Sequence, residues 1–380
     1  MPLRISMVGP VRPYRGGIAQ FTDTLADRMQ DRGHDVQIIT FSRQYPRLLF
    51  PGRTQFEPGH VAISREEGAL IDSINPISWR RAADEIARHR PKAVLFQYWL
   101  PFFAPSYGWM AARLNRQSIP VLAVLHNVLP HERRIGDEAL GRYFLRKCCG
   151  ALALSEKVAA DARSLGVGGP VRVAAHPVYE HFGALVDRTD ARERLGIPHE
   201  AEVLLFFGFV RAYKGLQTLL EAMPEISRRR PNALLLVAGE FYDDEAPYRA
   251  MVASHNLESR VRFDAEYISE ERVADYFAAA NLVVQPYRSA TQSGVVQTAY
   301  HFERPVVVTD VGGLAEVVPD GVSGFVVPPE QPGALADAVV RFFEAGLEQA
   351  MVEGVREVRQ RYTWDRLVDE VERLIATATE

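Results

Sequence analysis

Two cations, Arg211 and Lys214, stand between an apolar run and an amphipathic stretch. The run VLLFF at residues 203–207 is typical of a strand buried on both faces of a parallel sheet. Gly208 ends it, and apolar residues at helical spacing then predict a helix: Leu216, Leu219, Leu220, Met223 and Ile226. Open α/β sheets bind ligands where strands end, and helix starts favour anions, so this pair could hold a diphosphate while charge builds on it. A solvated loop with ordinary surface charges is the alternative.

Glycine-rich turns precede three further predicted helices. The first follows an apolar strand at residues 3–8 and places Gly16 and Gly17 where bare N–H groups can approach a phosphate or sugar, although a plain turn would look the same. It does not match the G-x-G-x-x-G fingerprint that a nicotinamide oxidoreductase needs. In the second half, YRSATQSG at 287–294 and DVGG at 310–313 open helices. We expect these two turns to converge with the Arg211/Lys214 turn on one crevice.

His126 follows an apolar strand predicted at residues 120–125. A histidine at the carboxyl end of a strand faces the ligand crevice, whereas a core histidine more often sits inside an element. Aromatic side chains cluster after another strand, at residues 93–96: Tyr98, Trp99, Phe102, Phe103, Tyr107 and Trp109. Core packing is favoured over a sugar-binding platform for this cluster, and both interpretations stay open.

The chain has 380 residues, which favours two domains, and strands alternate with helical patterns as in parallel, doubly wound sheets. Its net charge of −4 is unevenly spread. Residues 1–180 carry 24 Lys/Arg against 16 Asp/Glu, or +8, and residues 181–380 carry 20 against 32, or −12. The basic half suggests an anionic acceptor or membrane surface, or else a drift of charge without purpose.

The two cysteines, Cys148 and Cys149, are adjacent and cannot join distant segments, which fits a reducing cytoplasm. The first residues read as a strand rather than a signal peptide. The most apolar long stretch, residues 93–114, is interrupted by polar residues, prolines and a glycine, so we expect no transmembrane helix. Asp243 and Asp244 lie in a polar run, and we expect no metal site there.

Three segments resemble glycosyltransferase family 4 (group 1): FFGFVRAYKGLQTLLEA, SGVVQTAYHFERPVVVTDVGGLAEVVPDGVSGFVV and LHNVLPHE. The resemblance runs nearly end to end. It implies the α/β architecture called GT-B, with two Rossmann-like doubly wound parallel-sheet domains facing a central cleft. Residues 1–180 plus 362–380 would bind the acceptor and residues 181–361 the nucleotide sugar. A helix within YTWDRLVDEVERLI (362–375) would cross back to the first domain.

The resemblance further implies transfer of a sugar from a nucleotide donor, with retention at the anomeric carbon and without a metal. No cofactor is implied beyond the nucleotide-diphosphate sugar, which is a co-substrate. The residues implied as catalytic are His126, Arg211 and Lys214. Those implied for the donor are Gly16, Gly17, Gly208, Glu240, Tyr267, Gln292, Ser293, Gly294, Gln297 and Thr298. Those implied for the acceptor are Arg47, Tyr98, Trp99 and His131.

The chain departs from the family pattern at two places. Phe209 follows Gly208 where the family usually has an arginine. Ala290 and Thr298 stand where the family has two glutamates eight residues apart, and neither is a carboxylate. Neighbouring glutamines, at 292 and 297, could bind hydroxyls as neutral partners. A sugar-nucleotide epimerase, an inverting transferase and a non-catalytic nucleotide-sugar-binding protein therefore stay open as alternatives.

For partners, we expect a nucleotide sugar and a glycan or lipid-linked acceptor, as in polysaccharide or glycolipid synthesis, and no nucleic acid. The basic first domain suggests peripheral contact with a membrane. We expect the protein to be cytoplasmic and to act at the inner face of the membrane.

Overall fold

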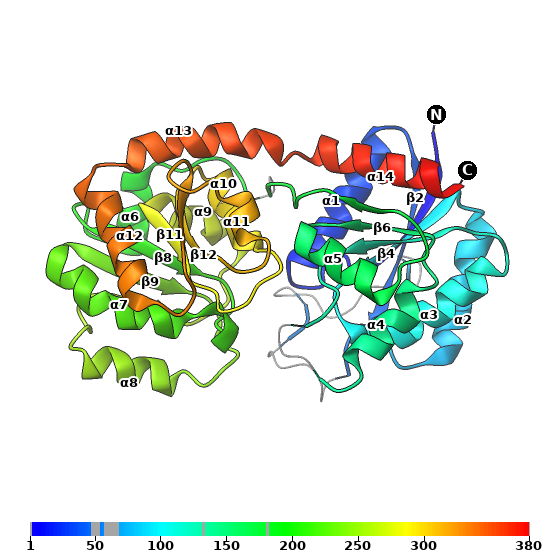
Figure 1. Ribbon diagram of the computed structural model, residues 1–380, viewed down its shortest axis with the longest axis horizontal. Helices are drawn as coiled ribbons and strands as arrows, with labels where there is room; N and C mark the ends of the chain where they lie inside the picture. The colour runs from blue at the N-terminus through cyan, green and yellow to red at the C-terminus, as the bar shows by residue number, and fades with distance from the viewer. Residues whose placement is uncertain (1, 47–53, 57–67, 131–133, 180–181, 380) are drawn as a thin grey trace. The chain divides into compact units, whose positions relative to one another are not determined.

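The computed structural model describes residues 2–46, 54–56, 68–130, 134–179 and 182–379. The chain divides into two compact units, which are coloured along the chain in Figure 1. Unit 1 comprises Met1–Ala175 and Trp364–Glu380, and unit 2 comprises His176–Thr363. The sequence placed these boundaries after residues 180 and 361.

Unit 1 is built on a seven-stranded parallel sheet with the order β3-β2-β1-β4-β5-β6-β7. Its strands are β1 (Arg4–Val8), β2 (Asp35–Arg43), β3 (Ala69–Asp72), β4 (Ala93–Tyr98), β5 (Val121–Leu125), β6 (Gly150–Ala153) and β7 (Val171–Val173). The central strands β4 and β5 are buried at every position, because helices cover both faces of the sheet. The order reverses between β1 and β4, which makes the carboxyl ends of these strands the expected place for a ligand.

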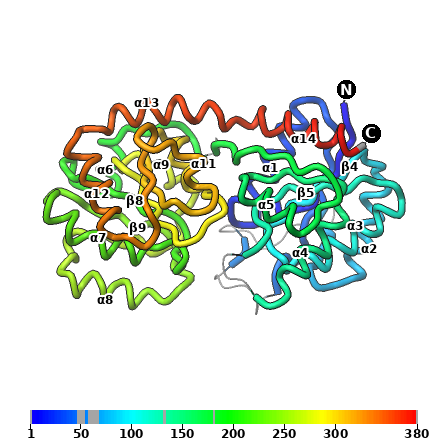
Figure 2. The backbone as a smooth tube through the Cα atoms, in the orientation of Figure 1, coloured from blue at the N-terminus to red at the C-terminus, as the bar shows by residue number. Residues whose placement is uncertain are grey.

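Two helical layers enclose this sheet. The helices are α1 (Gly17–Asp31), α2 (Pro76–His89), η2 (Pro101–Phe103), α3 (Ala104–Asn115), α4 (Asp137–Leu145), α5 (Glu156–Leu165) and α14 (Trp364–Thr379). One face packs against α2, α3, α4 and α5, and the other against α1 and α14. Figure 2 traces α14 beside α1, where Arg32 donates to Asp369 at 2.6 Å. The prediction that the C-terminal helix returns to the first domain is confirmed.

Unit 2 has a six-stranded parallel sheet with the order β10-β9-β8-β11-β12-β13. Its strands are β8 (Glu202–Phe207), β9 (Ala233–Ala238), β10 (Val261–Asp264), β11 (Leu282–Gln285), β12 (Val306–Thr309) and β13 (Gly324–Val327). The order reverses between β8 and β11, so the loops after these neighbouring strands start from one edge of the sheet.

The helices of unit 2 again cover both faces of the sheet. They are α6 (Arg188–Leu195), η3 (Ala212–Lys214), α7 (Leu216–Arg229), α8 (Ala246–Ser254), α9 (Glu270–Ala279), α10 (Gly294–His301), α11 (Leu314–Val317), α12 (Pro332–Glu344), α13 (Glu348–Val358) and η4 (Arg359–Arg361). The apolar residues that predicted α7 are all buried against the sheet. Each fully buried side chain of that size contributes about 1.5–3 kcal/mol.

The sequence-based prediction did not name every element, and β3, β13 and α6 are among those that it missed. β3 and β13 have four residues each. The polar run around residue 190 forms α6, which begins with Asp187 accepting hydrogen bonds from the N–H groups of Thr189 and Asp190. As expected, no helix in the described part of the chain combines the length and apolar character that a membrane crossing needs.

Candidate active site

The loop after β8, residues 208–215 and here called the cation loop, carries both predicted cations. Gly208 and Gly215 have φ angles of +95° and +73°, which side chains disfavour. A Cβ on Gly215 would lie 1.9 Å from the carbonyl oxygen of Pro286, so only glycine lets the loop approach the segment after β11. A Cβ on Gly208 would lie 3.1 Å from Lys214 Nζ. The two glycines therefore fold the loop so that Lys214 points back toward the end of β8.

Lys214 is buried, with 8% of its surface exposed. Its ammonium makes no hydrogen bond or ion pair with any described residue, and the Tyr287 ring lies 5.7 Å from Nζ. Burial, followed by the nearby Arg211 charge, lowers the pKa of Lys214 to about 8. Because a buried charge without a counterion is costly, an incoming anion would stabilise this group.

Arg211 is half-buried and supplies a second cation near the first. Its guanidinium makes no ion pair or hydrogen bond within the described part of the chain. It lies over the ring of Tyr242, with 5.4 Å between the guanidinium carbon and the ring centroid. The cation loop therefore presents two charges that protein carboxylates leave uncompensated.

The other two predicted turns lie against one another and against this loop. Arg288 N–H donates to the carbonyl oxygen of Tyr213 at 2.7 Å, which joins the turn after β11 to the cation loop. Gly312, with φ +54°, follows β12, and its Cβ would lie 1.7 Å from the carbonyl oxygen of Ala290. The expected convergence of three turns is thus present within unit 2.

The start of α10 borders the cation loop, because Val295 Cγ2 is 3.6 Å from the Cβ position of Gly208. Gly294 begins the helix after Ser293, whose hydroxyl lies 3.3 Å from that of Tyr287. The first N–H groups of a helix have no partner within it and attract anions. Lys214 and the start of α10 therefore lie next to Gly208 at the carboxyl edge of the sheet, with the Arg211 charge nearby.

Ala290 and Thr298, which stand where the family has two glutamates, make contacts within unit 2. Ala290 is buried, and its carbonyl oxygen lies close to Gly312. Thr298 is also buried, and its hydroxyl donates to the carbonyl oxygen of Gly294 at 2.9 Å within its own helix. Gln297 is buried with Oε1 lacking a partner among the described residues, and Gln292 is half-buried. Gln297 therefore keeps an open acceptor in the first turn of α10.

Glu240 and Tyr267 lie farther along the same sheet edge, after β9 and β10. The carbonyl oxygen of Glu240 accepts from the Val210 N–H at 2.9 Å, which brings it beside the cation loop. Tyr267 is half-buried ahead of α9.

In unit 1, His126 follows β5 and is buried. Its Nε2 lies 2.8 Å from Oε1 of Gln97, which is fully buried at the end region of β4, and its ring meets Phe21 edge to face at 4.7 Å. Gly9 follows β1, and a Cβ there would lie 2.7 Å from the Gln97 side chain. His126 is therefore held beside the switch point between β1 and β4, the region where open α/β sheets bind ligands.

The glycine pair of unit 1 lies at the start of α1. Gly16 is the N-cap residue, with φ +110°, and Gly17 is the first residue of the helix. A Cβ on Gly16 would meet nothing within 4 Å. Glycine is therefore required there by the backbone conformation rather than by crowding.

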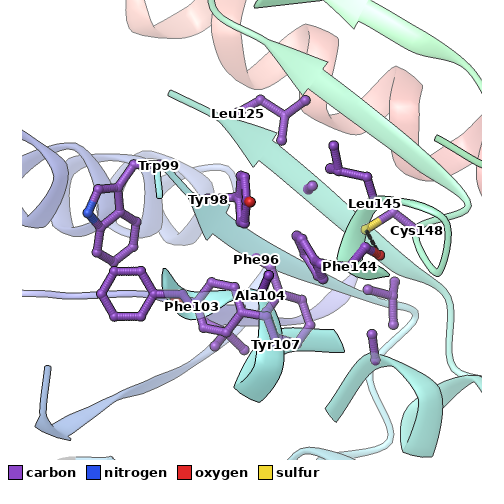
Figure 3. Packing of buried hydrophobic residues seen from close by; sticks show 14 of the residues in the cluster. Phe96, Tyr98, Trp99, Phe103, Ala104, Tyr107, Leu125, Phe144, Leu145 and Cys148 are labelled. Atoms are coloured by element: carbon purple, nitrogen blue, oxygen red, sulfur yellow. Dashed lines mark hydrogen bonds between the residues drawn. The ribbon is translucent and has the colours of Figure 1, made fainter. Parts of the chain in front are cut away.

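Two of the predicted acceptor residues lie in an aromatic core, shown in Figure 3. Tyr98 is fully buried and stacks on Phe144 with 5.1 Å between ring centroids. A ring enclosed on all sides offers no face to an acceptor, so the acceptor role predicted for Tyr98 is wrong and core packing applies. Trp99 keeps 8% of its surface exposed and donates from Nε1 to the Tyr45 hydroxyl at 3.0 Å. The other two predictions, Arg47 and His131, lie outside the described residues.

Two residues were missed by the sequence analysis. Gln97 was read only as an interruption of an apolar stretch, and Tyr242 was not considered. For Gln97, a polar residue within a buried strand was a usable signal in the sequence. For Tyr242 the sequence carried no such signal, because its contact with Arg211 joins two separate loops. Among the described residues, no group of three or more His, Cys, Asp or Glu side chains is arranged to hold a metal ion.

Two family models match the chain: Glycosyltransferase Family 4 over residues 15–180 and Glycosyl transferases group 1 over residues 201–345. The D-inositol 3-phosphate glycosyltransferase of Xylanimonas cellulosilytica is 27% identical over 402 aligned residues, which cover 96% of this chain and 92% of that protein. The alpha-D-kanosaminyltransferase of Streptomyces kanamyceticus is 27% identical over 212 residues, covering 53% of each chain.

Solved structures show the same architecture. Sucrose-phosphate synthase from Thermosynechococcus elongatus matches with a TM-score of 0.74 at 20% identity, covering 99% of this chain and 98% of that one. Anabaena HepE in complex with UDP-glucose matches with a TM-score of 0.75 at 16% identity, covering 99% and 100%. The predicted fold class is confirmed, and the chain belongs to the family 4, group 1 glycosyltransferases and is a glycosyltransferase of the GT-B fold.

Proposed function

We propose that this chain is a retaining glycosyltransferase that takes a sugar from a nucleotide-diphosphate donor without a metal ion. The observation that carries the proposal is the buried ammonium of Lys214, which has no ion-pair or hydrogen-bond partner among the described residues and lies beside Arg211 and the first turn of α10. This arrangement matches the needs of a diphosphate leaving group, because its charge grows as the sugar departs. Two fixed cations supply the compensation that a divalent metal provides in other transferases.

In the proposed reaction, the bond between the anomeric carbon and the diphosphate oxygen breaks while Lys214 and Arg211 hold the diphosphate. The acceptor hydroxyl forms the new bond on the same face of the sugar, and its proton passes to the departing diphosphate oxygen. The donor side is completed in this proposal by Gly16, Gly17, Gly208, Glu240, Tyr267, Gln292, Ser293, Gly294 and Gln297. In the same proposal His126 acts at the reacting centre, and Trp99 acts on the acceptor side.

The stereochemical course has a direct test. The purified chain is screened by thermal shift against a panel of nucleotide sugars, because a ligand of the native state raises apparent stability. The product made from the stabilising donor is then examined by proton NMR for its anomeric configuration, with and without a chelator. Retained configuration and equal rates support the proposal. An inverted product contradicts the retaining mechanism, and a rate lost on chelation contradicts metal independence.

We further propose that the acceptor is a glycan or lipid-linked sugar met at an anionic membrane surface. Residues 76–147, which include α2, α3 and α4 on one face of the unit 1 sheet, carry 12 Lys/Arg against 5 Asp/Glu, a net charge of +7. Large apolar side chains stand exposed among these charges, with Ile77 64% and Tyr143 41% exposed. Basic charge attracts anionic lipids, and exposed apolar side chains insert between headgroups.

Vesicle sedimentation tests the membrane proposal. We expect binding to vesicles containing phosphatidylglycerol, weaker binding to pure phosphatidylcholine, and a loss of binding when salt is raised. Ile77→Ser combined with Ile135→Ser should weaken sedimentation, while Val322→Ser, an exposed apolar control in unit 2, should leave it unchanged. Equal binding to both lipids, or none to either, contradicts the proposal.

A further inference from the structure

The loops after β8 and β9 stay paired beyond the ends of their strands. Val210 N–H donates to the Glu240 carbonyl at 2.9 Å, and Tyr242 N–H donates to the Val210 carbonyl at 3.0 Å. Val210 and Phe241 form an isolated parallel bridge. Phe241 in turn packs against Tyr248 and Phe263, with ring centroids 5.7 and 6.0 Å away. The backbone that carries Tyr242 is therefore tied to the same ladder as the cation loop.

This pairing brings two aromatic rings next to Arg211. Phe209 and Tyr242 lie 4.5 Å apart between ring centroids, at an interplanar angle of 35°. The Arg211 guanidinium carbon is 5.4 Å from the centroid of Tyr242. Tyr242 thus contacts both the Phe209 ring and the Arg211 guanidinium, and both aromatic residues are half-buried.

Arginines of unit 2 lie over rings in two settings: some, such as Arg230 and Arg249, also have a carboxylate partner, whereas Arg341 over Phe325 pairs with no carboxylate among the described residues. Arg230 lies over Phe343 and pairs with Glu202, and Arg249 lies over Phe263 and pairs with Glu245. Arg211 lies over the Tyr242 ring and has no carboxylate partner within the described part of the chain. A carboxylate would orient the guanidinium but neutralise it, whereas an aromatic face orients it and leaves its charge for a ligand.

We propose that Tyr242, supported by Phe209, is a positioning residue that holds the Arg211 guanidinium toward the diphosphate. The proposal rests on the diphosphate site described above and adds the way in which that site is prepared before the donor arrives. Arginine has several rotatable bonds, and an unrestrained side chain would lose that freedom on binding. A ring that restrains it beforehand raises affinity without touching the ligand. Phe209, which directly follows Gly208, then supports the Tyr242 ring and does not supply a further charge.

The test measures the affinity of inorganic pyrophosphate and of UDP by isothermal titration calorimetry on the full chain. Tyr242→Leu removes the ring, and Tyr242→Phe keeps it. Each is also made in an Arg211→Ala background, which completes a double-mutant cycle. Phe343→Leu is the matched control, because it removes a ring from an arginine that already has a carboxylate partner. Circular dichroism and melting temperature report the folding of each variant.

We expect Tyr242→Leu to weaken both ligands about fivefold, as for a partly exposed cation–π contact, with Tyr242→Phe and Phe343→Leu near wild type. In the Arg211→Ala background, Tyr242→Leu should cost nothing further. An equal loss in both backgrounds, no loss at all, or a loss shared by Tyr242→Phe overturns the proposal. If Tyr242→Leu does not fold, Tyr242→Met carries the same comparison.

The same measurements distinguish a failure of the positioning role of Tyr242 from a failure of the proposed diphosphate site. If Arg211→Ala weakens pyrophosphate but Tyr242→Leu does not, the diphosphate site stands and the positioning role fails. If neither Arg211→Ala nor Lys214→Ala changes the affinity for pyrophosphate, the diphosphate site itself is wrong.

Discussion

Replacing Lys214 with methionine is expected to stabilise the protein while it disables the enzyme. Methionine has a similar length and is uncharged, so it can occupy the buried site without an uncompensated charge. The pKa of Lys214 falls from an ordinary 10.5 to about 8 in the folded protein. A difference of that size means that burying the ammonium costs about 3 kcal/mol at neutral pH. We expect Lys214→Met to raise the free energy of unfolding by about 1–3 kcal/mol at pH 7.

The pH dependence of this gain has a definite sign. Between about pH 8 and 10.5 the unfolded chain keeps the Lys214 proton while the folded chain loses it. The unfolded state then binds more protons, so wild-type stability rises with pH across this window. The variant has no such group, and its advantage should shrink by about 2 kcal/mol between about pH 7 and 9.5.

The assay is urea unfolding at a series of pH values, followed on the same samples by sugar-transfer rates. Turnover of Lys214→Met should fall about a hundred- to thousandfold, because a fixed donor to developing charge is lost. Lys157→Met is the control, since Lys157 is half-exposed and pairs with Asp161 on the surface, and its stability should change by less than about 0.5 kcal/mol. If Lys214→Met is no more stable than the wild type at pH 7, or if the difference in unfolding free energy does not vary with pH, the claim that the buried Lys214 ammonium destabilises the fold is refuted. Near-normal turnover refutes its assigned role.

Further predictions concern the surroundings of both sites. Gln97→Leu should lower kcat about tenfold and leave the donor KM unchanged, because His126 loses the hydrogen bond that orients its ring. Steady-state kinetics measure both constants, and a change in the donor KM with an unchanged kcat would contradict this role. Gly215→Ala should cost more than about 2 kcal/mol in urea unfolding, since its Cβ would meet a carbonyl oxygen at a positive φ, and a neutral result would deny the tight loop. Thr298→Val should leave the donor KM within about twofold, because its hydroxyl serves its own helix, and a large rise would assign that hydroxyl to the donor. Arg32→Ala should cost about 1 kcal/mol, less at high salt, since its bonds to α14 are partly exposed; an undiminished loss at high salt would deny their ionic nature.

Local patterns were sufficient to predict the elements that carry the site. The apolar run of β8, the glycine after it and the helical spacing of α7 lie within one stretch of sequence, and all three are present in the structure. The same is true of His126 at the end of β5. Because parallel strands bring their carboxyl ends to one edge, the convergence of the turns followed from the alternation of strands and helices.

The remainder depended on contacts between segments far apart in the chain. Burial of Lys214 requires Gly215 to lie against Pro286, and no local pattern shows that approach. The aromatic run that starts at the end of β4 gave no sign of which ring would be enclosed, and Tyr98 is core because Phe144 of α4 stacks on it. Tyr242 reaches Arg211 only through the pairing that extends past β8 and β9. Such contacts are set by tertiary packing, which periodicity does not encode.

A crystal structure of the chain with bound UDP tests the central claim most directly. We predict that the diphosphate lies within hydrogen-bond distance of Lys214 Nζ and the Arg211 guanidinium, with its oxygens directed at the first N–H groups of α10. A diphosphate bound elsewhere on the chain, with these two side chains turned away from it, would contradict the proposed site.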